Sequence, residues 1–401
     1  MKKTDAYIVS PLRTGIGKFG GGLMPLKADE LAAFMINEIV RYAGVEPGLI
    51  EEVIVSQSYQ SSEAPCMGRY AANLAGLPIE VPGYTVDRRC GSGVQAIADA
   101  AMQVQTGVLD CAMVVGVESM SNIEYYSTDM RWGKRLGSVV LHDRLESGRV
   151  RSQPASRFGE CSGPIETAEN LAQDYGISRE EADRYACHSH RKAAAAWREG
   201  RFDKEVVPVP VPQRRGDPVL FREDQGIRAD ISLDDLAKLK PIIRGGTVTA
   251  GNASQQNDAA AGCLVVSESF LQRTGIEPMA RLLGWSAAGC DPLRMGIGPV
   301  PAVARLMPRI GLSLDDMDVV EVNEAFAAQI LAVLKEWGMV DDPRVNPNGS
   351  GISLGHPIGA TGMRIMTTLL HEMERRKARY GLETMCIGGG QGMAAVFERI
   401  A

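Results

Sequence analysis

Two cysteines stand in sequence settings that suit covalent chemistry. Cys90 lies in YTVDRRCGSGVQAI, after a short strand-like run and at the start of a predicted helix. A thiol at a helix N-terminus faces the positive end of the helix dipole, which lowers its pKa and favours the nucleophilic thiolate. Cys386, in ETMCIGGGQG, ends a predicted strand and precedes three glycines that expose backbone N–H groups. For each cysteine the alternative is an inert thiol packed in the core.

One histidine and one asparagine complete the candidate site. His356 lies in NPNGSGISLGHPIGATG, and it is the only one of the five histidines in a glycine-rich loop, before a helix predicted over residues 360–377. Asn323 closes a strand predicted over residues 318–322, and sites form at the carboxyl ends of strands in α/β sheets. A structural histidine and a turn-forming asparagine are the alternatives. Equivalent ends of duplicated strands would bring two thiols and one imidazole into one pocket.

Three other motifs are not interpreted as sites. Residues 15–20 (GIGKFG) match GxGxxG, but the next predicted helix begins about eight residues later, so a dinucleotide site is not predicted. Cys187 and His190 share one face of a helix, but no second pair of ligands follows, so no metal site is predicted. Residues 374–379 are basic and end a helix, where positive charge complements the dipole.

The elements that must position the candidate residues alternate as in an α/β sheet covered by helices. Apolar residues at helical spacing predict a helix over residues 29–42, with Asp29 as its cap. A buried strand is predicted over residues 51–57. The same alternation follows with a helix whose apolar face spans residues 94–104 and a strand over 111–117.

The chain also repeats itself. Residues 43–57 match residues 310–324 in pattern at an offset of 267, and residues 107–119 match 381–393 at an offset of 274. Two matches in the same order predict duplicated α/β halves. Residues 119–246 differ, because they are rich in charge and proline around one predicted helix at 179–198. This region is interpreted as an insertion that caps the site.

Composition excludes several classes of protein. With 401 residues the chain can bury a substantial core in two or three domain-sized units. A net charge of −6 gives no electrostatic footprint for nucleic acid, and no apolar run approaches the ~18 residues of a membrane span. Residues 1–5 lead directly into a strand-like run at 6–10, without the features of a secretory signal. Eight scattered cysteines without a CxxC pair predict reduced thiols in the cytoplasm.

The quoted motifs resemble those of the thiolase family. DRRCGSGVQAI is similar to its nucleophile box, VNEAFAAQ to its asparagine loop and NPNGSGISLGHPIGATG to its histidine box. CIGGGQGMAAVFE resembles its second-cysteine box, and TAGNAS with TAEN its middle-region signatures. The resemblance covers essentially the whole chain, in the order and spacing of the family.

The resemblance implies an α/β thiolase fold, in which two duplicated αβαβα-type halves form five layers with an inserted loop domain. The expected division is residues 1–118 with about 247–270 for the N-terminal half, 119–246 for the loop domain and 271–401 for the C-terminal half. It further implies a tight dimer, usually paired into a tetramer through that loop.

The resemblance also assigns catalytic roles. Cys90 is expected to attack the keto carbon of a 3-ketoacyl-CoA or the thioester of acetyl-CoA, and His356 to take its proton. Asn323 is expected to hold the oxyanion of the acetyl-CoA enolate through a water. Cys386 is expected to protonate that enolate in cleavage, or to remove the α-proton in condensation. The backbone N–H groups of Cys90 and Gly388 are expected to form the hole for the tetrahedral oxyanion.

Coenzyme A is implied as a substrate and product, with no cofactor and no metal. Ala250 and Ser254 of TAGNAS are expected along the pantetheine arm, and Arg228 near the nucleotide. Met295 and Phe326 are expected to wall the acyl and pantetheine tunnel.

Three departures from the family pattern leave the acyl preference open. Residues 163–166 (GPIE) stand where a methionine often lines the acyl pocket, Gln255-Gln256 follows TAGNAS, and Asp87 replaces the commoner asparagine. The resemblance implies an acetyl-CoA C-acetyltransferase in fatty acid metabolism, or a thiolase of broader or longer-chain preference. A ketosynthase-like enzyme is disfavoured by Cys386, and a non-catalytic CoA-binding scaffold by the presence of all four chemical groups.

Overall fold

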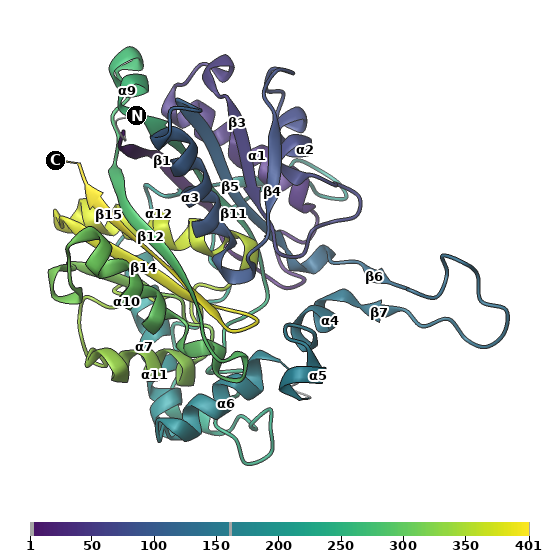
Figure 1. Cartoon of the computed structure of the whole chain (residues 1–401). Helices are drawn as coiled ribbons and strands as arrows, with labels where there is room; N and C mark the ends of the chain where they lie inside the picture. Colours follow the sequence, from purple (N-terminus) through teal and green to yellow (C-terminus); the bar gives the residue numbers. More distant parts are fainter. Residues whose placement is uncertain (1–3, 160–162, 401) are drawn as a thin grey trace.

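The computed structural model describes residues 4–159 and 163–400; residues 1–3 of the N-terminal run and Cys161 lie outside this part of the chain. Its main feature is one continuous sheet in the strand order β13-β14-β15-β12-β1-β11-β5-β3-β4, with β2 and β8 pairing at the side (Figure 1). The strands of the sheet are β1 (Ala6–Thr14), β2 (Gly17–Lys18), β3 (Glu52–Ser56), β4 (Gly83–Val86), β5 (Cys111–Ser119), β8 (Val206–Val207), β11 (Asn257–Ser267), β12 (Ala280–Gly289), β13 (Val319–Val322), β14 (Tyr380–Ile387) and β15 (Gln391–Arg399).

Three layers of helices enclose the two halves of this sheet. α1 (Ala28–Ala43) and α2 (Met67–Leu74) cover the outer face of the N-terminal strands. α10 (Pro299–Ile310) and α11 (Ala327–Trp337) cover the outer face of the C-terminal strands. Between the halves lie α3 (Ser92–Gln105) and α12 (Thr361–Arg376), whose apolar residues pack with strands of both. The five layers predicted for the fold are thus confirmed.

The helix predicted over residues 29–42 is confirmed as α1, but Asp29 is not its cap. The helix begins at Ala28, and the Glu30 carboxylate accepts a hydrogen bond of 2.7 Å from the Lys27 N–H. The strands predicted at 51–57 and 111–117 are confirmed as β3 and β5, and the helix at 179–198 as α7 (Arg179–Arg198).

The first internal repeat is confirmed. α1 ends at Gly44 with φ 63°, and a short 3-10 turn, η1 (Pro47–Leu49), leads into β3. In the other half α10 ends at Gly311 with φ 69°, and η5 (Leu314–Asp316) leads into β13. Helix, turn and strand therefore recur at the predicted offset.

The register predicted for the second repeat is wrong. Glu52 of β3 pairs with Ala112 of β5, and Val319 of β13 pairs with Gly381 of β14. Ala112 and Gly381 are thus equivalent, which is an offset of 269 rather than 274. The sequence match aligned Gly381 with the glycine of a turn. Gly381 instead lies inside a strand, where a Cβ would come 2.3 Å from Met373 Sδ of α12.

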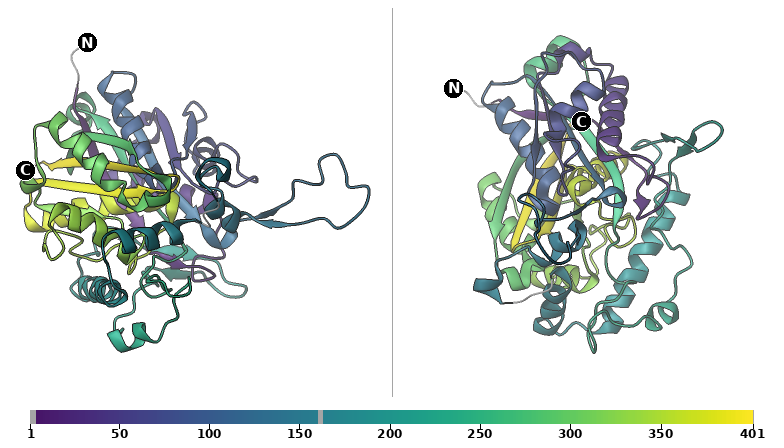
Figure 2. Two further views of the ribbon diagram at one scale, coloured as in Figure 1. Left: turned by 60° about the horizontal axis from the view of Figure 1, so that its bottom comes forward. Right: turned by 90° about the vertical axis from the view of Figure 1, so that its right-hand side faces the viewer.

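The inserted region lies between β5 and β11, and one short strand within it, β8, pairs with β1 at the side of the large sheet. It first forms an arm, in which β6 (Tyr125–Tyr126) pairs with β7 (His142–Asp143) and the connection extends far from the body (Figures 1 and 2). The remaining elements of the described residues are η2 (Arg89–Gly91), η3 (Met120–Asn122), α4 (Arg144–Val150), α5 (Ala155–Phe158), α6 (Pro164–Asp174), β9 (Val209–Val211), β10 (Val219–Phe221), α8 (Leu233–Ala237), α9 (Glu268–Thr274), η4 (Pro292–Ile297) and η6 (Ile358–Ala360). Within residues 4–159 and 163–400, no helix has the length and apolarity needed to cross a membrane.

Candidate active site

The two central helices meet end to end at glycines. A Cβ on Gly93, near the start of α3, would lie 2.5 Å from the backbone nitrogen of Met363 in α12. A Cβ on Gly362 would lie 2.6 Å from the backbone nitrogen of Val94 in α3. Only glycine permits this approach, which holds the N-terminal ends of α3 and α12 together.

Each of these helix starts carries one reactive side chain. Cys90 lies in the 3-10 turn η2 (Arg89–Gly91) directly before α3, and Arg89 has φ 50°. His356 lies just before η6 (Ile358–Ala360), the 3-10 turn that leads into α12. Close packing of the two helix ends therefore brings a thiol of one half next to an imidazole of the other.

Hydrogen bonds fix the orientation and tautomer of His356. Its Nδ1 lies 2.6 Å from the hydroxyl oxygen of Thr361, and that hydroxyl donates to the Pro357 carbonyl at 2.9 Å. Because the single hydroxyl hydrogen is used there, Thr361 accepts from Nδ1–H. This leaves Nε2 unprotonated, 3.3 Å from Cys90 Sγ. The imidazole is thus oriented to take the thiol proton.

Both partners are neutral in the resting site. Burial raises the pKa of the Cys90 thiol to about 11, although the Gly388 N–H and the Arg89 charge act in the opposite direction. The lowered thiol pKa predicted from the helix dipole is therefore wrong, because desolvation outweighs it. Burial, with a smaller effect of the Arg364 charge, lowers the pKa of His356 to about 3. Cys90 becomes nucleophilic only as His356 accepts its proton.

Cys386 reaches the same site from strand β14. It is next to last in β14, is fully buried and lines the cavity that holds Cys90 and His356. Burial raises the pKa of the Cys386 thiol well above its usual value, and a negative charge on Cys90 would raise it further. Gly389 and Gly390, with φ of 88° and 84°, turn the chain into β15 and leave the Gly388 N–H facing Cys90.

Asn323 lies behind the imidazole and is not among the residues that line the cavity. Its Nδ2 is 3.5 Å from Nδ1 and 3.4 Å from Nε2 of His356, so the amide packs against the ring rather than in line with either nitrogen. Its Oδ1 is buried without a hydrogen-bond partner among the described residues. Asn323 thus contacts the imidazole ring without lining the cavity.

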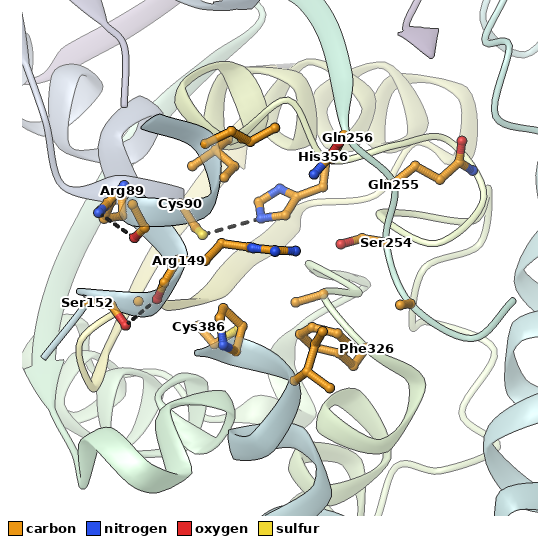
Figure 3. Close-up of a pocket in the computed structure, with 18 of the residues that line it drawn as sticks. Arg89, Cys90, Arg149, Ser152, Ser254, Gln255, Gln256, Phe326, His356 and Cys386 are labelled. Carbon is orange, nitrogen blue, oxygen red and sulfur yellow. Dashed lines mark hydrogen bonds between the residues drawn. The ribbon is translucent and has the colours of Figure 1, made fainter. Parts of the chain in front are cut away.

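The cavity has a volume of about 390 Å³ and is lined mainly by apolar side chains. Four of the five predicted CoA contacts line it: Ala250, Ser254, Met295 and Phe326. Figure 3 labels Ser254 and Phe326 among them. The predicted contact Arg228 does not line the cavity; it is exposed and lines a separate hollow beside α8. Backbone pairing between the TAGNAS loop and the asparagine loop brings Ser254 and Phe326 to the site: the Ser254 N–H donates to the Ala325 carbonyl at 2.9 Å, and Ala253 forms a β-bridge with Phe326.

Sequence reasoning missed the opposite wall of the cavity. Tyr59 comes from the N-terminal half, and Leu145, Arg149 and Ser152 come from α4 and the residues after it. No motif marks these four residues. Leu145, Arg149 and Ser152 carry one signal, their place in an insertion interpreted as a cap, and Tyr59 carries none. Of the departures from the family pattern, Pro164, Ile165, Gln255 and Gln256 also line the cavity. The Gln255 amide in addition donates to the carbonyls of Gly226 and Ile352, so it ties two loops together.

Cys187 and His190, which share one face of α7, both bind backbone groups of a neighbouring loop. The Cys187 thiol contacts the Ile231 carbonyl, and His190 Nδ1 accepts from the Arg228 N–H at 3.2 Å. Within residues 4–159 and 163–400, no group of three or more His, Cys, Asp or Glu residues is arranged to hold a metal ion.

Comparison with known proteins adds an independent line of evidence. The family model described as thiolase, N-terminal domain, matches residues 6–269, and that described as thiolase, C-terminal domain, matches residues 276–399. The chain is 45% identical over 405 residues to beta-ketothiolase BktB of Cupriavidus necator, with 99% of each chain covered. It is 45% identical over 397 residues to acetyl-CoA acetyltransferase of Chromobacterium violaceum, covering 98% of this chain and 100% of that protein. The crystal structure of Bacillus anthracis acetyl-CoA acetyltransferase superimposes with a TM-score of 0.94 at 43% identity, over 100% of both chains.

Proposed function

This chain belongs to the thiolase family, and we propose that it cleaves acetoacetyl-CoA with CoA and runs the reverse condensation of two acetyl-CoA molecules. It is a CoA-dependent acyltransferase, as its relatives named acetyl-CoA acetyltransferase indicate. The observation that carries the proposal is the 3.3 Å contact between Cys90 Sγ and the unprotonated His356 Nε2, in one cavity with the second thiol, Cys386.

Cleavage begins at the keto carbon of the substrate. Cys90 Sγ attacks C3 while its proton passes to His356 Nε2, and the resulting oxyanion is held by the backbone N–H groups of Cys90 and Gly388. The C2–C3 bond then breaks, and its electron pair forms the enolate of acetyl-CoA. Asn323, through a water, would hold the enolate oxygen, and the Cys386 thiol delivers its proton to C2.

The second half-reaction restores the enzyme. The thiol of free CoA attacks the acyl-Cys90 thioester and gives its proton to the Cys386 thiolate. His356 returns its proton to the departing Cys90 sulfur. A Cys386 thiol with a raised pKa suits both directions, because its thiolate is a strong base and the thiol is still a much stronger acid than the α-carbon of acetyl-CoA.

For the substrate we propose a path along the predicted CoA contacts. Ala250 and Ser254 would follow the pantetheine arm, with Met295 and Phe326 as its walls. Arg228, in its exposed hollow, would meet the nucleotide. A preference for longer acyl chains is the second candidate, since Pro164 and Ile165 line the cavity where a methionine often lines the acyl pocket of the family.

We also propose a homotetramer, assembled from tight dimers through the arm between β6 and β7. This is supported by the apolar side chains that the arm presents, among which Trp132 is 95% exposed and Leu136 84%. Such groups favour burial against another subunit. A cytoplasmic location and a role in fatty acid metabolism follow as proposals from the need for two reduced thiols and from the substrate.

Half-reactions measured separately test the proposed roles. Acetyl-CoA should acylate Cys90, which mass spectrometry of the Cys90 peptide detects as an added acetyl group. Cys386→Ser should keep this acylation but lower acetoacetyl-CoA synthesis by about 10²- to 10³-fold, because the base is removed. Absence of an adduct at Cys90 would refute the mechanism, and equal loss of both steps in Cys386→Ser would refute the role of Cys386.

A further inference from the structure

Glu324, the residue directly after Asn323, is buried and accepts four hydrogen bonds. The residue is 1% exposed. Its Oε1 accepts from the Tyr185 hydroxyl at 3.0 Å and from Asn346 Nδ2 at 3.1 Å. Its Oε2 accepts from the Ser189 hydroxyl at 2.7 Å and from the Ile352 N–H at 3.2 Å. One carboxylate therefore joins the asparagine loop to α7 and to the loop that leads to His356.

Asn346 fixes the residue on the other side of Asn323. Its Oδ1 accepts from the Val322 N–H at 2.8 Å, and its Nδ2 donates to the Val322 carbonyl at 2.9 Å as well as to Glu324. Val322 ends β13 and directly precedes Asn323. Both neighbours of Asn323 are thus held by hydrogen bonds to other segments of the chain.

The side chain of Asn323 depends on this hold, because it makes few contacts of its own. Within residues 4–159 and 163–400, its amide comes within hydrogen-bond distance only of the His356 ring, and its Oδ1 has no partner. The backbone of Gly351 packs against that oxygen, since a Cβ on Gly351 would lie 2.7 Å from it. The place of the amide is therefore set by the way its backbone is held.

His356 is anchored by bonds that do not involve Glu324. Its N–H donates to Asn257 Oδ1 at 2.8 Å, and its Nδ1 lies 2.6 Å from the Thr361 hydroxyl oxygen. Loss of the bonds to Glu324 should therefore displace Asn323 while the imidazole keeps its place.

We infer that Glu324 is a positioning residue for the enolate step and that it acts through Asn323. This inference rests on the proposed function, in which Asn323 holds the enolate oxygen through a water. The enolate forms in the condensation of two acetyl-CoA molecules but not in the transfer of an acetyl group to Cys90. Glu324 therefore matters for condensation, whereas acetylation of Cys90 proceeds without it.

Glutamine cannot replace Glu324 without conflict, although the two side chains have the same shape. Asn346 Nδ2 and the Ile352 N–H approach different oxygens of the carboxylate. A turned Asn346 amide would lose both bonds to Val322, and a backbone N–H cannot turn. In either orientation, the NH₂ group of glutamine faces one of these two donors.

The rates of acetylation and of condensation provide the test. In Glu324→Gln, synthesis of acetoacetyl-CoA should fall by roughly 10- to 100-fold, because a small displacement of Asn323 removes stabilisation of the enolate. Acetylation of Cys90 by acetyl-CoA, measured by rapid quenching and mass spectrometry of the Cys90 peptide, should change by less than about twofold. Tyr185→Phe removes one donor to the carboxylate, so it should lower synthesis by roughly fivefold with the same preservation of acetylation.

Glu321→Gln is the matched control. Glu321 lies three residues before Glu324, in β13, is fully buried, and its two carboxyl oxygens have no hydrogen-bond partner among the described residues. Burial raises the pKa of Glu321 to about 8, so its neutral acid predominates at pH 7 and a glutamine resembles it. Both rates should change by less than about twofold. A fall in synthesis equal to that in Glu324→Gln would overturn the inference, because the loss of any buried carboxyl group of this segment would then suffice.

The other outcomes separate this inference from the proposed function. Acetylation and synthesis that fall by the same factor in Glu324→Gln would overturn the role of Glu324, as would unchanged synthesis in this variant. Should Glu324→Gln fail to fold, the two rates in Tyr185→Phe decide in the same way. Wild-type enzyme in which acetyl-CoA does not acetylate Cys90 refutes the proposed function itself.

Discussion

The N-terminal ends of α3 and α12 have equivalent backbone arrangements in the two halves of the molecule. Ser92 and Thr361, the first residues of the two helices, are 269 positions apart, as are Ala112 and Gly381 in the strands that follow. Both first residues donate a side-chain hydroxyl to the turn before them, Ser92 to the Arg89 carbonyl at 2.6 Å and Thr361 to the Pro357 carbonyl at 2.9 Å. Duplication therefore accounts for the frame that holds the site.

The chemistry is placed at positions that are not equivalent. Cys90 corresponds to Gly359, where a Cβ would come 2.7 Å from both Gln57 Cα and the Val117 carbonyl oxygen. No side chain fits there, so only the N-terminal half can carry the nucleophile. His356 corresponds to Asp87, whose carboxylate accepts from the Arg89 N–H at 2.8 Å and shapes the nucleophile turn. A symmetric frame thus became one asymmetric site.

Single substitutions at the equivalent positions His356 and Asp87 should have the most unequal effects on catalysis. His356→Gln removes the acceptor for the Cys90 proton, and we expect kcat/KM for acetoacetyl-CoA thiolysis to fall by about 10³- to 10⁴-fold. Asp87→Asn keeps an acceptor oxygen for the Arg89 N–H, so a change below about threefold is expected. Steady-state kinetics of both variants checks this, and similar losses would contradict the division of roles between the halves.

The sequence predicted most of this site, since its residues lie in glycine-rich boxes at the ends of strands. It could not predict the tautomer of His356 or the packing of the Asn323 amide against the ring, because both depend on contacts between loops of different halves. The raised pKa of Cys90 was missed for a related reason: a helix dipole is visible in sequence, whereas burial by the opposite half is not. The division of the chain at residues 118, 246 and 270 stays a prediction.

The glycines where the helices meet should affect stability more than catalysis. Gly93→Ala and Gly362→Ala each put a Cβ within 2.6 Å of a backbone nitrogen of the other helix, and neither backbone can move aside alone. We expect each to lower the free energy of unfolding by about 3 kcal/mol through overpacking. Gly48→Ala is the control, since a Cβ there has nothing within 4 Å and φ is not positive. Urea unfolding monitored by circular dichroism measures all three variants.

Equal behaviour of Gly48→Ala and Gly93→Ala would show that the helix ends tolerate separation. A loss confined to only one of the two contact glycines would show that the halves do not share the contact equally. Either result would contradict the view that the starts of α3 and α12 contribute equally to the contact between the halves.

Removal of the hydroxyl from Thr361 or from Ser92 should give the smallest difference in kcat/KM between equivalent positions of the two halves. Thr361→Val removes the acceptor for Nδ1–H of His356, so the imidazole gains from moving its hydrogen to Nε2, where it can no longer accept the Cys90 proton. One lost hydrogen bond of about 1.4 kcal/mol corresponds to about a tenfold fall in kcat/KM. Thr361→Ser should restore activity, because it keeps the hydroxyl. Ser92→Ala loses the equivalent hydroxyl without touching an imidazole, so its kcat/KM should change by less than about threefold.

The pH profile shows whether this loss comes from the tautomer. With the pKa of His356 lowered to about 3 and that of Cys90 raised to about 11, His356 is protonated only at pH below about 3 and Cys90 ionised only above about 11. The reactive neutral pair therefore persists between them, and kcat/KM of the wild type should be level from about pH 5 to 9. A change of tautomer moves no net proton, so Thr361→Val should lower this plateau without tilting it. An acid limb near pH 6.5 in the wild type would show that His356 titrates as an exposed histidine does, and the arrangement at the start of α12 would then not hold the imidazole neutral.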